Sequence, residues 1–198
     1  MKKTLIIPII LLVLSSCGAT YKMNLSLLTV DVKSDKSSYQ STNVRDTLMN
    51  DMVYMTFKDS IVDIKWVQGK NRFVLLLENL SEETMKINWD EVTYVNPFGL
   101  AERLWHATGF YSHSDIEQVP TIIPSKKSIL EPIVQESNIF FYKVWREKRL
   151  LVYKFENNKQ VDSYLGKPVQ LYLPIYVGDK KVEYKFNFYI WIMTPVQY

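Results

Sequence analysis

The 198-residue chain has few of the residues that build disulfide frameworks, nucleotide loops and metal sites. It contains one cysteine, which excludes an intramolecular disulfide. Its six glycines are widely spaced, which excludes GxGxxG and Walker-type phosphate loops and the G-x-S-x-G nucleophile elbow. Two histidines are present, and no apolar run reaches the length of a membrane-spanning helix. The common signatures of nucleotide-dependent and thiol enzymes are therefore missing.

The chain also lacks a large excess of positive over negative charge, or the reverse. The 24 basic and 21 acidic side chains give a net charge of +3, to which Lys2 and Lys3 contribute at the N-terminus. A chain this close to neutral has no electrostatic signal for a nucleic-acid partner. Hydrophobic residues make up 47% and charged residues 23%, as in an ordinary globular domain that needs neither metal nor disulfide to fold.

The N-terminus has the pattern of an export signal. Lys2 and Lys3 precede an apolar stretch at residues 4–14, which is too short to cross a bilayer and is typical of the hydrophobic region of a signal peptide. The next motif, Leu14-Ser15-Ser16-Cys17, resembles the lipobox of bacterial lipoproteins. We therefore expect residues 1–16 to be a cleaved signal peptide.

The lipobox resemblance implies a lipid anchor at Cys17. In lipoproteins the thiol receives a diacylglyceryl group, the chain is cut before the cysteine, and the new α-amine is acylated as well. Two or more acyl chains give stable attachment, because each buried CH₂ contributes about 0.8 kcal/mol. Residues 17–24 are then a lipidated tether, and the membrane is the first partner. The alternative is that Cys17 is an ordinary buried thiol.

Gly18 bears on which membrane receives the protein. In enterobacterial lipoproteins, an Asp at this position resembles a signal for retention in the inner membrane, and here it is replaced by glycine. The following residues also lack the acidic tract that marks surface export in lipoproteins of the Bacteroides group. The expected location is the cell envelope, anchored in the outer membrane and facing the periplasm.

The mature chain has the pattern of an all-β protein. Short apolar runs with a period of two alternate with turn residues, and long helical patterns are few. We expect an antiparallel β-sandwich over residues 25–198, immunoglobulin-like in arrangement, with a closed barrel as the alternative. Residues 34–51 are rich in Ser, Thr, Asn and Asp and predict a long flexible loop.

Two hairpins can be placed in register from their apolar residues. In the first, Trp66 is expected opposite Phe73, and the near-continuous hydrophobicity that follows predicts a strand buried on both faces. In the second, Leu173 is expected opposite Phe186, with Asp179-Lys180 as a two-residue turn. Both registers put the large apolar side chains of each hairpin on one face, which predicts that this face is core.

Aromatic side chains cluster beside Gly109: Trp105, His106, Phe110 and Tyr111. On an exposed loop, these rings would stack on sugar rings or on a peptide, and they are the candidate ligand contacts of the chain. The alternative is that they belong to the core or rim of the sandwich.

The best candidate for a metal site is an alternating polar segment. His113, Asp115 and Glu117 would share one face of a strand, and His106 would be a fourth ligand. Alternating polar residues are also typical of a solvated strand face, and the HExxH spacing is absent. We therefore expect no bound metal, and no motif predicts a cofactor.

Basic side chains gather near residue 146: Lys143, Arg146, Lys148 and Arg149, with Lys154 a little farther on. Anionic lipid headgroups near the anchor would attract such a cluster. Glu147 and Glu156 interrupt the run, which favours a solvated strand face instead.

Six motifs follow one another between residues 60 and 192: Asn79-Leu80-Ser81, Ile87–Val92, Pro97-Phe98-Gly99, Leu104-Trp105-His106, Pro120–Ser125 and the final hairpin. The set resembles uncharacterised bacterial lipoproteins with one β-sandwich domain. In that family Trp89, His106 and Pro120–Pro124 are recurring landmarks, and the resemblance brings no established activity. The chain departs from the pattern after Pro124, where Ser125 and two lysines replace a Pro-Gly-like turn.

Together these patterns favour a non-enzymatic, lipid-anchored envelope protein whose sandwich binds or supports another envelope component. The second expectation is a protein that binds carbohydrate or peptidoglycan fragments through the aromatic residues at 105–111. A hydrolase is third, because it requires a deep pocket with converging carboxylates or both histidines. Exposed, coplanar rings over a groove would favour the second function over the first.

Overall fold

The computed structural model describes residues 18–49, 52–106 and 117–196, and within these ranges the chain is mostly β-strand. The strands are β1 (Ala19–Ser34), β2 (Ser38–Ser41), β3 (Val44–Met49), β4 (Met52–Lys58), β5 (Val62–Gln68), β6 (Phe73–Asn79), β7 (Met85–Ile87), β8 (Thr93–Val95), β9 (Ala101–His106), β10 (Thr121–Ile123), β11 (Ser128–Gln135), β12 (Ile139–Tyr142), β13 (Val144–Glu147), β14 (Val152–Phe155), β15 (Pro168–Val177) and β16 (Lys180–Pro195). The helical elements of the described ranges are α1 (Asn158–Asp162) and the single 3-10 turns η1 (Trp89–Glu91) and η2 (Glu136–Asn138).

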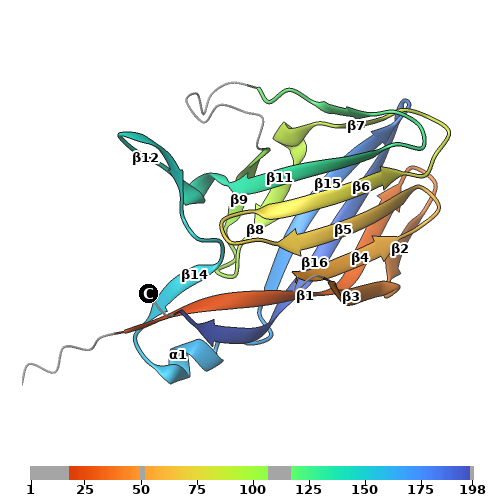
Figure 1. Ribbon diagram of the computed structural model, residues 1–198. Helices are drawn as coiled ribbons and strands as arrows, with labels where there is room; N and C mark the ends of the chain where they lie inside the picture. The colour runs from red at the N-terminus through yellow and green to blue at the C-terminus, as the bar shows by residue number, and fades with distance from the viewer. Residues whose placement is uncertain (1–17, 50–51, 107–116, 197–198) are drawn as a thin grey trace, which may run out of the picture.

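Fourteen strands of the described ranges belong to one antiparallel sheet, which curves over on itself into a barrel-like sandwich (Figure 1). The main path runs β14-β1-β16-β15-β8-β9-β11-β6-β5-β4-β3. β9 turns the corner, because Ala101–Arg103 pair with β8 while Leu104–His106 pair with β11. The all-β antiparallel sandwich is confirmed. The immunoglobulin-like arrangement is not confirmed, because β9 joins the two halves into one sheet where that fold has two separate sheets.

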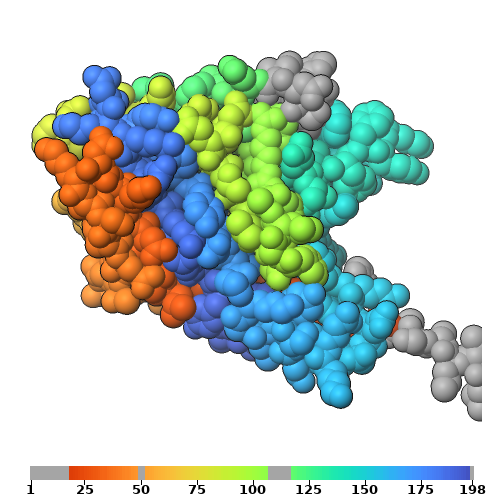
Figure 2. All heavy atoms as spheres, turned by 180° about the vertical axis from the view of Figure 1, so that it is seen from behind, coloured from red at the N-terminus to blue at the C-terminus, as the bar shows by residue number. Residues whose placement is uncertain are grey.

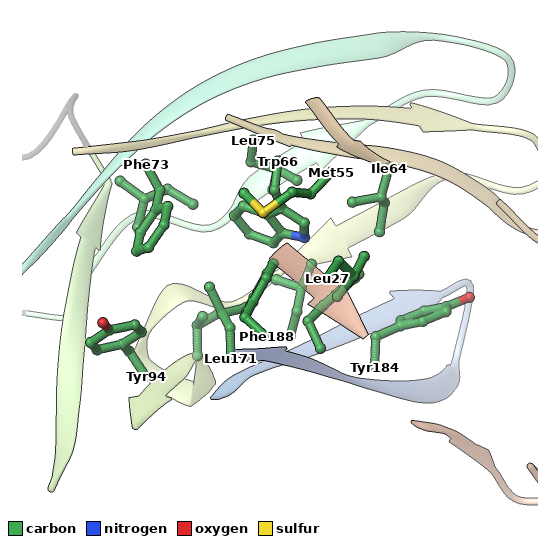
Figure 3. Packing of buried hydrophobic residues seen from close by; sticks show 14 of the residues in the cluster. Leu27, Met55, Ile64, Trp66, Phe73, Leu75, Tyr94, Leu171, Tyr184 and Phe188 are labelled. Carbon is green, nitrogen blue, oxygen red and sulfur yellow. The ribbon is translucent and has the colours of Figure 1, made fainter. Parts of the chain in front are cut away.

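The core lies between the inner faces of the two halves (Figure 3). Trp66 on β5 packs edge-to-face against Phe186 on β16, with ring centroids 5.4 Å apart, and against Phe188 at 6.4 Å. Such aromatic pairs add about 0.5–1.5 kcal/mol each beyond the burial of their area. Phe186 and Phe188 are both buried, so the predicted core face of the C-terminal hairpin is confirmed.

The register of the first predicted hairpin is wrong by two residues. Trp66 pairs with Leu75 and not with Phe73. The connection spans four residues, closed by a hydrogen bond from the Gly69 amide to the Arg72 carbonyl (3.0 Å). A shift of two keeps every side chain on its face, so the predicted core face is right. Burial on both faces is wrong, since β6 alternates between buried side chains and half-buried or exposed ones.

The register of the C-terminal hairpin is also displaced by two residues. Leu173 pairs with Tyr184, and the turn residues are Gly178-Asp179, not Asp179-Lys180. Gly178 has φ 56°, and a positive φ at the first turn position is what a two-residue type II′ turn requires. Glycine adopts this conformation without steric cost, which fixes the turn one residue earlier than the apolar pattern alone indicates.

Two segments that were expected to lack regular structure contain strands. Of the segment 17–24 that was expected to be a tether, residues 19–24 belong to β1, which begins at Ala19, paired with Phe155 of β14. Residues 34–51 are not one long loop, because β2 pairs with β1 and β3 pairs with β4. Both β2 and β3 are short and carry mostly exposed side chains. Polar strands of this kind are common at sheet edges, where they discourage pairing with other chains, and they leave little apolar periodicity in the sequence.

Candidate ligand-binding groove

The structure buries two of the aromatic residues that were expected to contact a ligand. Trp105 and His106 lie on β9 and are 5% and 4% exposed. The Arg103 guanidinium lies 4.7 Å from the centroid of the Trp105 ring. Phe110 and Tyr111 fall outside the described residues. Trp105 and His106 therefore belong to the rim of the core, as in the alternative, and are not stacking platforms for a ligand.

His106 is part of a polar network beside the core. Its ring stacks on Trp89, with centroids 5.0 Å apart and planes 14° apart, and its Nδ1 lies 3.7 Å from a Glu131 carboxylate oxygen. The Trp89 indole donates to the Thr121 hydroxyl (2.9 Å), which donates to the other Glu131 oxygen (3.0 Å). The network connects η1, β9, β10 and β11. It gives Trp89, His106 and the Pro120–Pro124 segment a common structural role.

The predicted alternating metal ligands are not brought together in the described part of the chain. His113 and Asp115 lie outside it, and Glu117 is exposed. Within the described residues, no group of three or more His, Cys, Asp or Glu side chains is placed to hold a metal ion.

A groove of about 590 Å³ crosses the outer face of the sheet. Its floor is the outward face of β15 and β16, with β1 and β2 along one wall and η1, β8 and β9 along the other. Figure 2 shows this face, with the blue strands of the floor between the orange and the yellow-green walls. Six charged side chains line the groove, three of each sign: Lys33, Lys181, Lys185, Asp31, Glu91 and Glu183.

Asp31 stands on the wall formed by β1. Its carboxylate accepts hydrogen bonds from the side-chain amides of Asn187 (3.0 Å) and Gln40 (2.7 Å), and Lys185 Nζ lies 3.8 Å away. Burial by itself would raise the pKa of Asp31, but the two amide donors and the lysine charge outweigh it and lower the pKa. The group is therefore a fixed negative charge at neutral pH.

Glu91 stands on the opposite wall. It accepts from the Tyr176 hydroxyl (2.8 Å to each oxygen) and forms an ion pair with Lys181 (2.9 Å). Burial opposes ionisation of Glu91, yet the hydrogen bonds from Lys181, Tyr176 and Asn88 lower its pKa. The hydrogen bond with Glu91 raises the pKa of Lys181 and that of Tyr176. Each of these groups keeps its charge state across the neutral range.

Tyr172 supplies an aromatic surface on the floor of the groove. Its side chain is 37% exposed, and its hydroxyl donates to Gln170 Oε1 (3.3 Å). The Lys185 ammonium lies 5.5 Å from the ring centroid. The groove thus combines one exposed ring with fixed charges of both signs, an arrangement suited to holding a ligand by stacking and charge-assisted hydrogen bonds.

The groove was missed in the sequence because its residues come from seven elements. One row across the sheet runs from Gln40 through Asp31, Lys185 and Tyr172 to Thr93. The alternation of polar residues along β16 marks an outward face, but only the pairing of the strands shows which polar residues become neighbours.

No helix in the described part of the chain is both long and apolar enough to cross a membrane. Comparisons with protein-family models, with curated proteins and with solved structures gave no match to this chain. The groove and the lipobox-like motif are therefore the features from which function is inferred.

Proposed function

We propose that this protein is a lipid-anchored component of the bacterial cell envelope that binds another envelope component without chemically changing it. The resemblance of Leu14-Ser15-Ser16-Cys17 to a lipobox supports the anchor. The groove on the outer face of β15 and β16 supports the binding. The outer membrane, facing the periplasm, remains the proposed location because Gly18 follows the cysteine.

The observation that carries a binding role is the charge state of the groove. General acid–base catalysis works best with a group whose pKa lies near the working pH. Here the pKa values of Asp31 and Glu91 are lowered and those of Lys181 and Tyr176 are raised, so all four move away from neutrality. Fixed charges of this kind favour recognition over proton transfer.

The charges also indicate the kind of ligand. Lys33 and Glu183 are 4.0 Å apart with side chains 72% and 49% exposed, so this pair contributes little to stability. Breaking the Lys33–Glu183 ion pair to make contacts with a ligand therefore costs little free energy. We propose a peptide segment with charges of both signs, which would replace such pairs with its own and rest an apolar side chain on Tyr172.

A second candidate, binding of a peptidoglycan fragment, is favoured by Tyr172 itself. An exposed ring flanked by Gln170 and Lys185 offers a surface for a sugar together with hydrogen-bond donors. In the carbohydrate hypothesis this site takes the place of Trp105 and His106, because both of these side chains are buried.

The anchor is tested by mass spectrometry of the protein purified from membranes. We expect an N-terminus at Cys17 that carries a thioether-linked diacylglyceryl group. Cys17→Ser should leave the protein unprocessed, because serine has no thiol to accept the lipid. An unmodified Cys17 in the native protein would overturn the anchor and leave the groove to be judged separately.

The groove is tested with a photo-crosslinking amino acid placed at Tyr172 of the full chain in its own envelope, with the same probe at Ile122 as the control. Ile122 is 54% exposed on β10 and does not line the groove. Protein adducts at position 172 alone would support the peptide ligand, and glycan adducts would support the second candidate. Equal adducts at both positions, or none at 172, would contradict a binding groove. Lys185→Glu should abolish the adduct at 172, because it reverses one charge beside the probe.

A further inference from the structure

Strands β12 and β13 form an arm that stands away from the sandwich (Figure 1). Its large apolar side chains are exposed: Phe140 38%, Phe141 64%, Tyr142 59%, Val144 57% and Trp145 44%. An isolated two-stranded hairpin is marginal in water, and so large an exposed apolar group on a folded protein commonly marks a contact surface. The arm is therefore expected to contact another molecule.

The base of the arm removes its acidic residue from the exposed surface. The Glu147 side chain is only 8% exposed, and its carboxylate accepts from Arg72 Nη2 (2.6 Å) and Nε (3.2 Å). In the sequence this glutamate interrupts the basic run. In the structure it faces the β5–β6 connection, while Lys143, Arg146 and Lys148 stay exposed. Glu147 therefore does not give this strand face the mixed charge that the sequence indicates.

A second basic surface adjoins the base of the arm. A hollow of about 470 Å³ is lined by three cationic residues, Lys22, Lys70 and Arg149, and its other described lining residues carry no carboxylate. The Leu150 amide donates to the Lys70 carbonyl (2.9 Å), which fixes this hollow beside the arm. The arm and the hollow together are called the basic end below.

The basic end lies where the chain leads to Cys17. β1 begins at Ala19, which pairs with Phe155, and Lys22 pairs with Val152 a few residues after the arm. The start of β1 and the arm point toward the same end of the molecule in Figure 1. Two residues span at most about 7 Å, so a lipid on Cys17 would hold this end within reach of the headgroups.

We infer that the basic end is a membrane-contact surface, in which the aromatic side chains of the arm enter the interface of an anionic phospholipid bilayer while its lysines and arginines bind the headgroups. This inference rests on the lipid anchor proposed above and deepens it. Trp and Tyr are enriched at membrane interfaces, and cations beside an anionic surface are attracted to it. A protein partner would need no such excess of one charge, nor a position beside the anchor.

The test uses the full lipidated chain in vesicles of phosphatidylcholine and phosphatidylglycerol. Phe141→Cys introduces a thiol at the arm, to be labelled with an environment-sensitive fluorophore. Asp179→Cys, in the exposed turn between β15 and β16 at the opposite end, is the matched control. The parent chain should take no label, because the lipid occupies the thiol of Cys17. We expect a blue-shifted emission and several-fold stronger quenching by a lipid-borne quencher at position 141 than at 179.

Three results would contradict the inference. Equal quenching at 141 and 179 would show that the arm stays in water. Unchanged quenching in phosphatidylcholine alone, or with Lys143→Glu and Arg146→Glu together, would exclude the headgroup contacts. A blue shift that appears in detergent without vesicles and grows with protein concentration would assign the arm to a second copy of the chain. Labelling of the parent chain at Cys17 would instead overturn the lipid anchor itself.

Discussion

The sandwich core and the β12–β13 arm place the same kinds of residue in opposite environments. Trp66 and Phe186 are fully buried between the two halves of the sheet, whereas Phe141 and Trp145 are 64% and 44% exposed. All four lie on antiparallel strands. The difference arises because a second layer faces β5 and β16, and no described strand outside the hairpin pairs with the arm. An aromatic residue in a strand therefore predicts an interface, but not whether that interface lies within the chain.

Truncation of one ring in each region should show the largest difference between them. Phe186→Ala should lower the free energy of unfolding by about 3–5 kcal/mol, because it removes a buried ring and leaves a cavity. Phe141→Ala, its matched control on the arm, should change it by less than about 0.5 kcal/mol in solution. Urea unfolding followed by circular dichroism measures both. Similar losses would mean that the arm is packed as the core is.

Polar side chains should show the same difference between positions packed against the core and exposed positions. Gln68 bridges the backbone of β1 where its register with β16 shifts, donating to the Met23 carbonyl (2.7 Å) and accepting from the Leu25 amide (3.0 Å). Gln68→Leu leaves two half-buried backbone groups without this partner and should cost about 1–3 kcal/mol in urea unfolding. Gln40→Leu, at an exposed position on β2, is the control and should cost far less. Equal losses of unfolding free energy in the two variants would show that Gln68 does not stabilise β1 at the register shift.

A smaller effect is expected at Tyr184, whose hydroxyl donates from the core to Asp59 (3.1 Å). Burial and the Asp59 charge raise the pKa of this phenol far above its ordinary value of 10.0. As pH rises past 10.0, the phenol ionises in the unfolded chain before it ionises in the folded one. The stability contributed by this shift is therefore fully present below pH 10.0 and is lost as pH rises above it. Tyr184→Phe should cost about 0.5–1.5 kcal/mol at neutral pH and lose less stability than the parent in alkali. Parallel alkaline losses in thermal unfolding at stepped pH would contradict this.

The smallest effect is expected on the outer face of the sheet. Lys185 lies in the groove, 3.8 Å from Asp31, and both side chains are about one third exposed. Lys185→Ala should change the free energy of unfolding by less than about 0.5 kcal/mol, since exposed ion pairs contribute little. A loss in urea unfolding that approaches the loss at Phe186 would mean that the wrong face of the hairpin has been taken as core.

The pattern of apolar residues predicts the fold class and the buried faces, but not the strand pairing. Phe186 and Phe188 lie on the face that the period of two assigns to the core. The same period is satisfied by every register that differs by two, and the turns decide among them. In the C-terminal hairpin, Gly178 takes the positive φ and so sets the turn one residue earlier than predicted. In the first hairpin, the connection from Gly69 to Arg72 sets the register two residues from the predicted one.

The groove and the basic end depend on neighbours that are distant in the chain. Asp31, Lys185 and Tyr172 meet only because β1, β16 and β15 pair side by side. Glu147 looks like part of an exposed mixed-charge run until Arg72 is seen beside it. Local patterns carry no information about such contacts, since they are set by the order of strands in the sheet. This is why Trp105 and His106 drew attention in the sequence while Tyr172 did not.

The pairing of β1 with β16 would set the order of events in the proposed export. The first strand of the fold lies beside the last along nearly its whole length, from Tyr21 with Pro195 to Ser34 with Val182. Besides its local partner β2, the partners of β1 in the described residues are β14 and β16, which lie near the end of the chain and in the proposed export would cross the membrane last. Closing so long a loop is slow. With the lipid anchor proposed above, the domain would therefore still be unfolded when Cys17 is cut and acylated, and it would fold after its attachment to the membrane.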